Sequence, residues 1–369
     1  MEGGRFLGSG TYGCAFTPPL LCEKDTKKHF GKVGKITTEP LAKQEILIGN
    51  RIRKVPLASH YFLLPEPESC TPAAETLQTE PGLEVCRDDF EDHGEALDIQ
   101  DMKQVFEPFG GIMPFYELFT KQSFHPKHFN FIYLMRHLLE AGSTLLLASV
   151  CHFDLHPGNL LVDKKKTIRI LDFGLSFPTN NINDTVVNGR WKRLRFGFES
   201  DAAHPTVHNS EAPELTIMNS IRRREYSVQD GVKLTVLGKA IFKDMETYLG
   251  ITKEDARDSL VDFFESSKFA KQRDFVGLWK IYWPGFDGWA IGSLLLDTLK
   301  NLLLLPEFAQ GQYKTRKSSI LATLRGLLEP DPRKRLDCIE ALALYDPASP
   351  WIARFGKKWL AARKQQRQR

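Results

Sequence analysis

Residues 151–174, CHFDLHPGNLLVDKKKTIRILDFG, contain the features that decide the fold. A short loop carries Asp154 and Asn159, two apolar runs follow it, and the stretch ends in an Asp-Phe-Gly turn that begins at Asp172. The apolar runs predict a β-hairpin, which returns its two ends to the same place. We therefore expect oxygen atoms of these three residues to converge. Converging carboxylate and amide oxygens can hold Mg²⁺ against a polyphosphate, and one acid is left to orient a hydroxyl group.

This stretch resembles the catalytic loop and metal-binding turn of the protein kinase superfamily, whose pattern is H-R-D-L-x-x-x-N followed by D-F-G. The resemblance implies that ATP is the phosphoryl donor, that Asp154 is catalytic, and that Asn159 and Asp172 hold Mg²⁺. Two positions depart from the pattern, because Phe153 replaces an arginine and His156 replaces a lysine. We keep His156 as a catalytic candidate, although a largely neutral imidazole neutralises phosphoryl charge less well than an ammonium group.

Length and composition limit the alternatives. The 369 residues exceed the usual size of one compact unit, so we expect two lobes. Hydrophobic residues at 42% and charged residues at 26% are typical of a globular protein. A net charge of +4 is too small to indicate binding to nucleic acid. The most apolar runs are interrupted by charges, so they predict buried helices and no membrane span.

The six cysteines lie at positions 14, 22, 70, 86, 151 and 338. They lack C-x-x-C spacing, which argues against a zinc site and gives no disulfide framework. The first residues also lack the basic start and apolar core of a signal peptide. We therefore expect reduced thiols in an intracellular, cytoplasmic protein.

Residues 7–16, LGSGTYGCAF, place three glycines in a pattern of strand, turn and strand. Glycines there would let backbone N–H groups approach phosphate oxygens. No helix pattern follows, which favours a kinase-type hairpin over a dinucleotide-binding turn. Ala15 stands where the kinase family usually has valine above adenine. The expected ATP-binding positions in this stretch are Leu7, Gly8, Ser9, Gly10, Thr11, Tyr12, Gly13 and Ala15.

Residues 29–36, HFGKVGKI, resemble the kinase strand whose lysine pairs with the phosphates. Lys32 and Lys35 must face opposite sides of a strand, so only one can face a nucleotide. We choose Lys35 as the catalytic lysine because Val33, a plausible adenine contact, shares its face, whereas bulky Phe30 holds the equivalent place for Lys32. The alternative is that both lysines are solvated.

A helix is predicted to start at residues 38–40, Thr-Glu-Pro, with proline near the first helical position. One face of this helix would carry Leu41, Glu45, Ile48 and Ile52. A carboxylate such as Glu45 is costly to bury on an apolar stripe unless it is paired. The kinase resemblance supplies Lys35 as its partner.

Residues 65–100 are strongly acidic, which predicts an inserted, solvated excursion, with a partner-binding site as the alternative. Residues 102–106 predict a strand that leads to 107–111, EPFGG, which resembles the kinase hinge. Backbone groups of such a hinge would contact adenine, so we expect ATP-binding positions at Glu107 and Phe109.

Later residues bear on the kind of phosphotransferase. The loop pattern D-x-H-P-G-N also resembles small-molecule phosphotransferases of the aminoglycoside type. However, Ala-Pro-Glu at 212–214 resembles the end of a protein kinase activation segment, and Asp287 begins a D-x-W-x-x-G pattern typical of the helix that follows. The resemblance pairs Glu214 with Arg335 in a buried structural ion pair. We assign structural roles to these three residues and to Glu45.

Two basic segments remain. The run from Arg190 to Arg195 predicts a solvated face, with contact to an acidic substrate or partner as the alternative. The tail from Arg354 to Arg369 predicts a basic helix that frays at the chain end.

We therefore predict a bilobal α+β fold of the protein kinase type, with a small antiparallel β lobe and a larger, mainly helical lobe. The expected parts are an N-terminal lobe at 1–106, a hinge at 107–111, a C-terminal lobe at 112–346 with insertions near 175–210 and 215–286, and a basic tail at 347–369. Packed helices are expected in the second insertion.

The predicted function is transfer of the γ-phosphoryl group of ATP, with Mg²⁺, to serine or threonine hydroxyls of a protein substrate. A small-molecule phosphotransferase and a pseudokinase scaffold are the alternatives. The compact N-terminal lobe and the large insertions are similar to kinases carried by large nucleocytoplasmic DNA viruses. That resemblance would place the protein in the cytoplasm of a host cell or in a virion.

Overall fold

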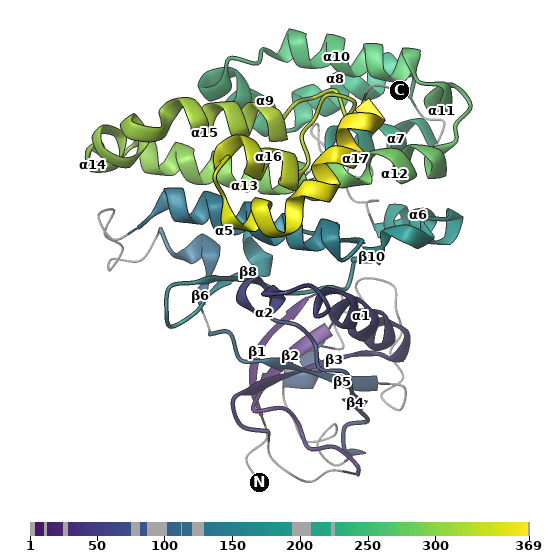
Figure 1. Cartoon of the computed structure of the whole chain (residues 1–369). Coiled ribbons are helices and arrows are strands. Elements are labelled where there is room, and N and C mark those ends of the chain that lie inside the picture. Colours follow the sequence, from purple (N-terminus) through teal and green to yellow (C-terminus); the bar gives the residue numbers. More distant parts are fainter. Residues whose placement is uncertain are drawn as a thin grey trace. The chain divides into compact units, whose positions relative to one another are not determined.

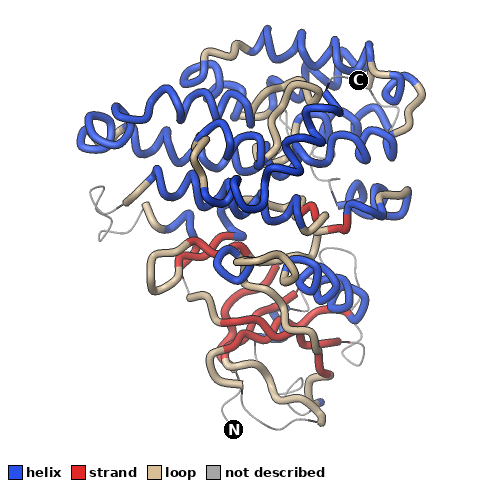
Figure 2. Tube along the Cα trace, in the orientation of Figure 1, coloured by secondary structure: helices blue, strands red, loops and turns tan. Residues whose placement is uncertain are grey.

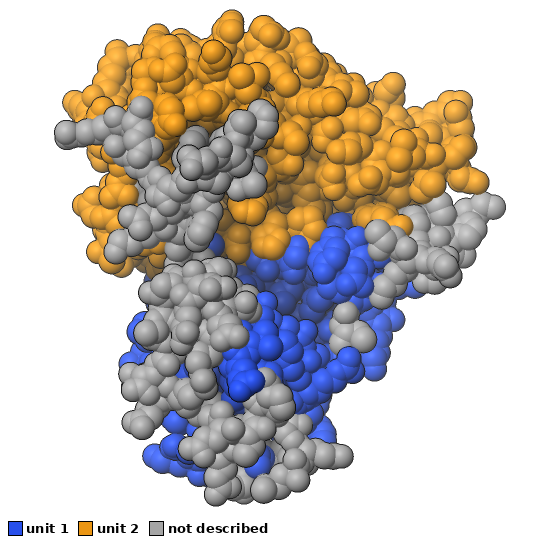
Figure 3. Space-filling view, turned by 180° about the vertical axis from the view of Figure 1, so that it is seen from behind, with its two compact units in different colours: residues 1–118, 158–176 blue, residues 119–157, 177–369 orange. Residues whose placement is uncertain are grey.

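The computed structural model describes residues 4–10, 13–24, 29–74, 82–86, 102–111, 113–119, 129–193, 208–222 and 226–367. The chain forms two compact units (Figure 3). The first, here called the sheet unit, comprises residues 1–118 and 158–176, and the second, the helical unit, comprises residues 119–157 and 177–369. An antiparallel sheet in one unit and mainly helices in the other confirm the predicted α+β, kinase-like fold class.

The sheet unit contains a five-stranded antiparallel sheet in the order β1-β2-β3-β5-β4 (Figures 1 and 2). Its strands are β1 (Arg5–Gly10), β2 (Gly13–Thr17), β3 (Lys32–Thr38), β4 (Ser69–Cys70) and β5 (Met102–Pro108). The strand predicted at 102–106 therefore continues through Glu107 and Pro108. This extension places the Glu107 side chain within the sheet.

Helices α1 (Glu39–Ile52) and α2 (Ala58–Tyr61) also belong to the sheet unit. Thr38 precedes α1 and Pro40 lies in its first turn, as predicted from the start signal. The four residues of the predicted stripe, Leu41, Glu45, Ile48 and Ile52, are all buried. The amphipathic pattern thus set both the position and the orientation of α1.

The predicted hairpin is present as β8 (Leu160–Val162) and β9 (Ile168–Ile170), which form a second sheet with β6 (Met113–Pro114). Leu160 pairs with Ile170, and the Leu171 N–H donates to the Asn159 carbonyl at 3.1 Å. The hairpin therefore brings the residues that flank its two strands together within the sheet unit. A short helical turn, η2 (Phe115–Glu117), follows β6.

Two disulfides, Cys14–Cys86 and Cys22–Cys70, cross the sheet unit, with Cα separations of 5.8 and 5.9 Å. The expectation of reduced thiols is therefore wrong for these four cysteines. The paired cysteines lie 72 and 48 residues apart, so no local spacing motif reveals the pairing. Cys151 and Cys338 are free and buried.

The disulfides also revise the interpretation of the acidic segment 65–100. Residues 75–81 and 87–101 lie outside the described residues, but residues 82–86 are helical. Leu83 and Cys86 are buried in one cluster with Phe16 and Ile36. This part of the segment is therefore a component of the core and not a solvated excursion.

The helical unit contains the remaining elements. Its strands are β7 (Val150–Cys151) and β10 (Phe177–Pro178), which pair with each other. Its helices are α5 (Phe131–Leu147), α6 (Asp184–Arg193), α7 (Pro213–Arg222), α8 (Val228–Gly238), α9 (Ile241–Asp244), α10 (Lys253–Ser266), α11 (Lys268–Lys271), α12 (Phe275–Tyr282), α13 (Phe286–Leu303), α14 (Pro306–Phe308), α15 (Lys314–Leu327), α16 (Cys338–Tyr345) and α17 (Lys357–Arg367). Shorter helical turns are η5 (Thr179–Asn181), η7 (Met245–Leu249), η8 (Trp283–Gly285), η9 (Ala309–Tyr313) and η10 (Ile352–Gly356). The turn η4 (Pro157–Asn159) begins at the last residue of segment 119–157 of the helical unit and continues into the sheet unit.

Helix α13 is the central helix of this unit, since most of its residues are buried and α5, α9 and α15 contact it (Figure 1). The stretch predicted as a second insertion forms packed helices, with α10 against α8 and α8 against α7. Within the described part of the chain, no single helix is both long and apolar enough to cross a membrane. One pair of segments, 275–303 and 306–327, bent by 110°, passes on length and composition when taken together.

The C-terminal helix α17 is anchored, which contradicts the expected fraying. The Trp359 Nε1–H donates to Asp337 Oδ2 at 2.8 Å, and Arg363 pairs with the same oxygen at 3.0 Å. Asp337 also caps α16 by accepting hydrogen bonds from the Ile339 and Glu340 N–H groups. One buried carboxylate thus joins the start of α16 to the middle of α17.

Candidate active site

One face of the sheet carries several of the predicted nucleotide contacts. In the strand register, Ala15 on β2 and Val105 on β5 both lie opposite Lys35 on β3, and Val33 lies opposite Glu107. Side chains two residues apart on a strand project to the same face. These five side chains therefore share one face, as predicted for Val33 and Lys35.

Lys35 is the centre of an ion-pair cluster on this face. Its Nζ donates to Glu45 Oε1 of α1 at 2.7 Å and to Asp172 Oδ1, after β9, at 2.8 Å. Lys32 instead pairs with Glu66 at 2.8 Å, so the predicted choice between the two lysines matches these contacts. Burial alone would lower the pKa of Lys35, but Asp172 and then Glu45 outweigh it and raise that pKa. Lys35 therefore stays charged.

Glu107 adds a third carboxylate to the surroundings of Lys35. Its side chain is buried, and among the described residues its Oε1 has no hydrogen-bond partner. Burial first, and then the nearby Glu45, raise the pKa of Glu107 to about 8. The sequence indicated only a backbone role for this residue, because the hinge resemblance placed it beyond the end of the strand.

Gly13, at the start of β2, lies close to Lys35. Strands β1 and β2 pair up to Gly10 opposite Gly13, whereas Thr11 and Tyr12 lie outside the described residues. A Cβ at Gly13 would lie 2.5 Å from the Ile36 carbonyl and 3.0 Å from Lys35 Cε. Only glycine fits there, so this backbone approaches Lys35 as closely as it can.

The other predicted contacts in this turn, Leu7, Gly8 and Ser9, lie on β1. Ser9 is exposed, and Leu7 and Gly8 are partly buried. A Cβ at Gly8 would meet no atom within 4 Å. Close approach therefore requires glycine at position 13 and not at position 8.

The predicted metal ligands Asn159 and Asp172 flank the β8–β9 hairpin. Asp172 has a left-handed backbone, with φ of 64°, and its Oδ1 also accepts from the Gly174 N–H at 3.2 Å. Among the described residues there is no group of three or more His, Cys, Asp or Glu side chains that could hold a metal. A carboxylate plus an amide oxygen still fits Mg²⁺, which is commonly bound by one or two carboxylates and completed by phosphates and water.

The segment before Asp154 is fixed within the helical unit by Asp287 of α13. This carboxylate accepts hydrogen bonds from the His152 N–H at 2.7 Å and the Phe153 N–H at 2.9 Å. Phe153 adopts a left-handed backbone, with φ of 70°, which is rare for a bulky residue and persists only when neighbours hold it. The two hydrogen bonds to Asp287 stabilise this backbone conformation, which gives the predicted structural role of Asp287 a physical basis.

Phe153, where the kinase pattern has arginine, is part of an aromatic cluster. Its ring centroid lies 5.7 Å from that of Phe177 and 5.1 Å from that of Trp279. The cluster replaces the expected cation with apolar packing. Of the basic run at 190–195, only the Arg190 side chain is described, and it lies 5.4 Å from the Phe177 ring.

Asp154 and His156 lie next to each other on the loop. His156 Nε2 is 3.8 Å from Asp154 Oδ1, which is too long for a hydrogen bond. The side chains of Asp154 and His156 are 29% and 40% exposed. A partly exposed carboxylate at the end of a fixed loop is suited to accept a hydrogen bond from a hydroxyl group.

Glu214 and Arg335 form the predicted buried ion pair. Arg335 Nη1 and Nη2 donate to the two Glu214 oxygens at 2.7 and 2.9 Å, and Arg335 Nε donates to the Glu329 carbonyl at 2.8 Å. The guanidinium also lies 4.9 Å from the Trp289 ring centroid. This bidentate pair joins the start of α7 to the segment before α16.

Lys239 is a buried residue that no sequence motif indicated. Its Nζ donates to the His208 carbonyl at 2.7 Å and to the Glu211 carbonyl at 2.9 Å. Burial lowers the pKa of Lys239 to about 8. These bonds fix the residues immediately before α7, at the end of a stretch, 194–207, that lies outside the described residues.

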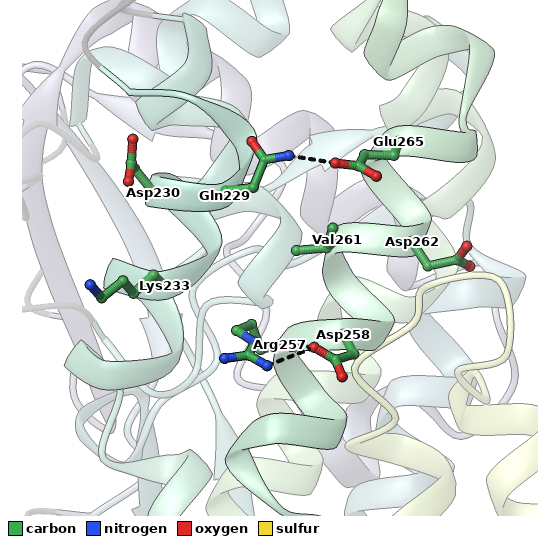
Figure 4. Close-up of a pocket in the computed structure, with 8 residues that line it drawn as sticks. All are labelled: Gln229, Asp230, Lys233, Arg257, Asp258, Val261, Asp262 and Glu265. Carbon is green, nitrogen blue, oxygen red and sulfur yellow. Dashed lines mark hydrogen bonds and ion pairs between the residues drawn. The ribbon is translucent and has the colours of Figure 1, made fainter.

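A cavity of about 530 Å³ lies between α8 and α10 in the helical unit (Figure 4). It is lined by Gln229, Asp230, Lys233, Arg257, Asp258, Val261, Asp262 and Glu265. Two hydrogen bonds join residues that line this cavity, because Gln229 donates to Glu265 and Arg257 donates to Asp258 (Figure 4). None of the predicted site residues lines it.

Comparison with known proteins finds similarity to kinase-like proteins over parts of the chain. Residues 121–188 match the family described as ABC1 atypical kinase-like domain. The chain is 29% identical over 115 residues to the eIF-2-alpha kinase GCN2 of Schizosaccharomyces pombe, and 29% identical over 114 residues to the mitogen-activated protein kinase p38a of Drosophila melanogaster. The matched segments cover 31% and 28% of this chain, but only 7% and 31% of those relatives.

These matches and the fold support a protein kinase-like superfamily. They give no support to a viral branch. The ABC1 match spans the loop with Asp154 and the turn with Asp172, which are the residues on which the sequence prediction depends.

Proposed function

We propose that this protein transfers the γ-phosphoryl group of ATP to serine or threonine hydroxyls of a protein substrate. The observation that carries the proposal is the contact of Lys35 with both Glu45 and Asp172. A lysine held by two carboxylates on the face below a glycine turn is placed to meet phosphate oxygens and does not need a further protein partner. Kinases require both of these carboxylates to be in place.

Each residue has a defined task in this proposal. Lys35 holds the phosphates, and the Gly13 backbone covers them from the turn. Mg²⁺, held by Asn159 and Asp172, supplies charge neutralisation on the phosphates. Asp154 orients the acceptor hydroxyl, and Asp287 fixes the backbone from which Asp154 projects.

The Glu214–Arg335 pair favours a protein substrate. It fixes the start of α7, next to the residues held by Lys239, and the sequence there resembles the segment at which protein kinases receive their substrates. A small-molecule phosphotransferase is the second candidate, and the match to the ABC1 atypical kinase-like domain and His156 favour it. A pseudokinase scaffold is disfavoured because Lys35, Asp154, Asn159 and Asp172 are all present.

The test is transfer of γ-labelled phosphate from ATP with Mg²⁺ to generic protein substrates, comparing wild type with Asp154→Asn. We expect label on serine or threonine, and a loss of about 10²- to 10⁴-fold in the variant, since a positioned acid–base group contributes that much. ATP binding should be unchanged, because Asp154 acts on the acceptor.

The matched control is Asp258→Asn, an acid that is 70% exposed on α10. It should transfer like wild type. Equal transfer by Asp154→Asn and wild type would overturn the role of Asp154. Label found only on small alcohols would overturn the protein substrate.

A further inference from the structure

A turn at residues 208–211, immediately before α7, is held by Lys239 at the end of α8. The Glu211 N–H donates to the His208 carbonyl at 3.2 Å and closes this turn. The Lys239 Nζ donates to both the His208 and the Glu211 carbonyl, at 2.7 and 2.9 Å. An ammonium group has three donors and no acceptor, so a single lysine can bind two carbonyl groups of one turn at once.

The two hydrogen bonds from Lys239 are charge-assisted near neutral pH. Burial lowers the pKa of Lys239 only to about 8, so the ammonium form predominates at pH 7. A hydrogen bond from a charged donor is stronger than one between neutral groups. Because Lys239 is only 1% exposed, water does not replace the two carbonyl groups if the turn moves away. The turn is therefore strongly favoured in this one position.

Trp289, in the first part of α13, holds the same turn. Its Nε1–H donates to the Asn209 carbonyl at 2.9 Å. Two residues earlier on α13, Asp287 fixes the backbone of the loop that carries Asp154. The start of one buried helix therefore fixes both the 208–211 turn and the loop whose carboxylate is proposed to orient the acceptor hydroxyl.

The side chains of the turn are accessible, although its carbonyl groups are engaged within the helical unit. His208 is exposed, and Ser210 and Glu211 are partly exposed. A surface that is fixed before its partner arrives loses little conformational entropy on binding, which favours affinity. The 208–211 turn is therefore suited to receive a polypeptide.

We propose that Lys239, assisted by Trp289, is a positioning residue for the protein substrate, because it presents the 208–211 turn to the polypeptide that carries the acceptor hydroxyl. This proposal rests on the proposed function. Helix α8 lies in the stretch 215–286, expected as an insertion, so the kinase resemblance supplies no counterpart of Lys239. Lys239 itself contacts neither nucleotide nor acceptor. Its loss should weaken binding of the protein substrate and leave the chemical step unchanged.

The experiment compares wild type with Lys239→Met at pH 7 with saturating ATP and Mg²⁺. The substrate is whichever of casein, histones and myelin basic protein wild type labels best. We expect KM for that protein to rise by about tenfold or more, with kcat near wild type, because bonds from a charged donor to the turn are lost. Hydrolysis of ATP by water needs no polypeptide and should be unchanged, as should ATP binding measured by calorimetry. A merely structural role would lower hydrolysis and transfer together.

Two further variants complete the design. Trp289→Phe removes the donor to Asn209 but keeps an aromatic ring beside Arg335, so it should also raise KM for the protein substrate. It tests the turn independently if Lys239→Met does not fold. Lys233→Met is the matched control, because Lys233 is an exposed lysine on the same helix, and it should behave like wild type.

An unchanged KM for the protein substrate in folded Lys239→Met would overturn the role of Lys239 and leave the proposed function intact. The same holds for a parallel fall in transfer and ATP hydrolysis. If only Trp289→Phe folds, an unchanged KM in that variant decides against the proposal. Wild type that hydrolyses ATP or labels small alcohols, but labels none of the three proteins, would overturn the protein substrate and the role of Lys239 with it.

Discussion

The two units hold their buried ion pairs in different ways. In the helical unit, Arg335 satisfies both oxygens of Glu214, donates to a backbone carbonyl, and lies against a tryptophan ring. In the sheet unit, Lys35 serves two carboxylates at once, and Glu45 Oε2 remains without a partner among the described residues. Both carboxylate oxygens of the Glu214–Arg335 pair are therefore hydrogen-bonded, whereas the cluster around Lys35 retains a carboxylate oxygen that could accept another hydrogen bond.

This difference separates a structural ion pair from a binding site. A fully paired charge in a buried position fixes local geometry, and losing one partner is costly because the other charge is left uncompensated. A cluster with unsatisfied acceptors is instead suited to a ligand that supplies donors or cations.

The units also differ in covalent links, since both disulfides lie in the sheet unit and both free cysteines in the helical unit.

The largest effect should come from reducing the disulfides. We expect reduction to lower the free energy of unfolding of the sheet unit by about 2–4 kcal/mol per bond, because each link restricts the unfolded chain. All six tryptophans lie in the helical unit, at positions 191, 279, 283, 289, 351 and 359. Tryptophan fluorescence should therefore change little on reduction, while hydrogen exchange of the sheet strands should rise.

The paired variants Cys14→Ser/Cys86→Ser and Cys22→Ser/Cys70→Ser separate the contributions of the two bonds. Variants of the free cysteines, Cys151 and Cys338, control for loss of thiols alone. Unaltered exchange in the reduced sheet strands would show that the links do not stabilise this unit.

The next largest effect should be that of Arg335→Met. Glu214 would remain buried without its partner, so we expect a loss of about 3–5 kcal/mol in the free energy of unfolding. Denaturation followed by tryptophan fluorescence measures it, because Arg335 contacts Trp289. The double variant Glu214→Met/Arg335→Met should recover most of the loss. Arg257→Met, in an exposed pair, should cost less than about 1 kcal/mol.

A smaller effect is expected at the glycine turn. Gly13→Ala would push a methyl group onto the Ile36 carbonyl and Lys35, so we expect a loss of about 1–3 kcal/mol and weaker ATP binding. Gly189→Ala, with open space around its Cβ and no positive φ, is the matched control and should stay near wild type. Thermal unfolding by circular dichroism and calorimetric titration with ATP provide the two measurements. Equal effects at both positions would contradict the close approach at Gly13.

Taken per pH unit, the smallest effect should be a pH dependence due to Glu107. Its pKa rises to about 8 on folding from an ordinary value of 4.5, so between these values the folded state binds more protons than the unfolded state. Stability must then fall as pH rises through this window, by up to about 1.4 kcal/mol per pH unit. Glu107→Gln should remove this contribution. Urea denaturation from pH 5 to pH 8 measures both slopes, and identical slopes would show that Glu107 does not titrate in this range.

Much of the frame of the site was predictable from the sequence because its signals are local. The apolar stripe that carries Glu45 follows helical periodicity, and the hairpin between Asn159 and Asp172 follows from two short apolar runs. Strand alternation separated Lys35 from Lys32. The Glu214–Arg335 pair came from a family resemblance, since periodicity alone does not reveal a partner so far along the chain.

The features that were missed depend on contacts between distant residues. No sequence feature near Cys14 indicates that this residue pairs with Cys86. The acidic composition around Cys86 also gave no sign that Leu83 and Cys86 are buried in the core. The cysteines therefore no longer support the cytoplasmic location expected from the sequence, because disulfides are rare in reducing compartments. Glu107 and Lys239 were missed because burial, and not residue type, makes them unusual.

The two disulfides are nested, since Cys22 and Cys70 both lie between Cys14 and Cys86 along the chain. During synthesis, the inner pair is complete before the outer one. At about 5–20 residues per second, Cys14 would wait on the order of 4–14 s for Cys86 across their separation of 72 residues. Cys14 and Cys22, eight residues apart, are both available before either native partner emerges, so the order of emergence alone would favour their mispairing. Once the inner bond Cys22–Cys70 has formed, it shortens the loop that the outer bond must close.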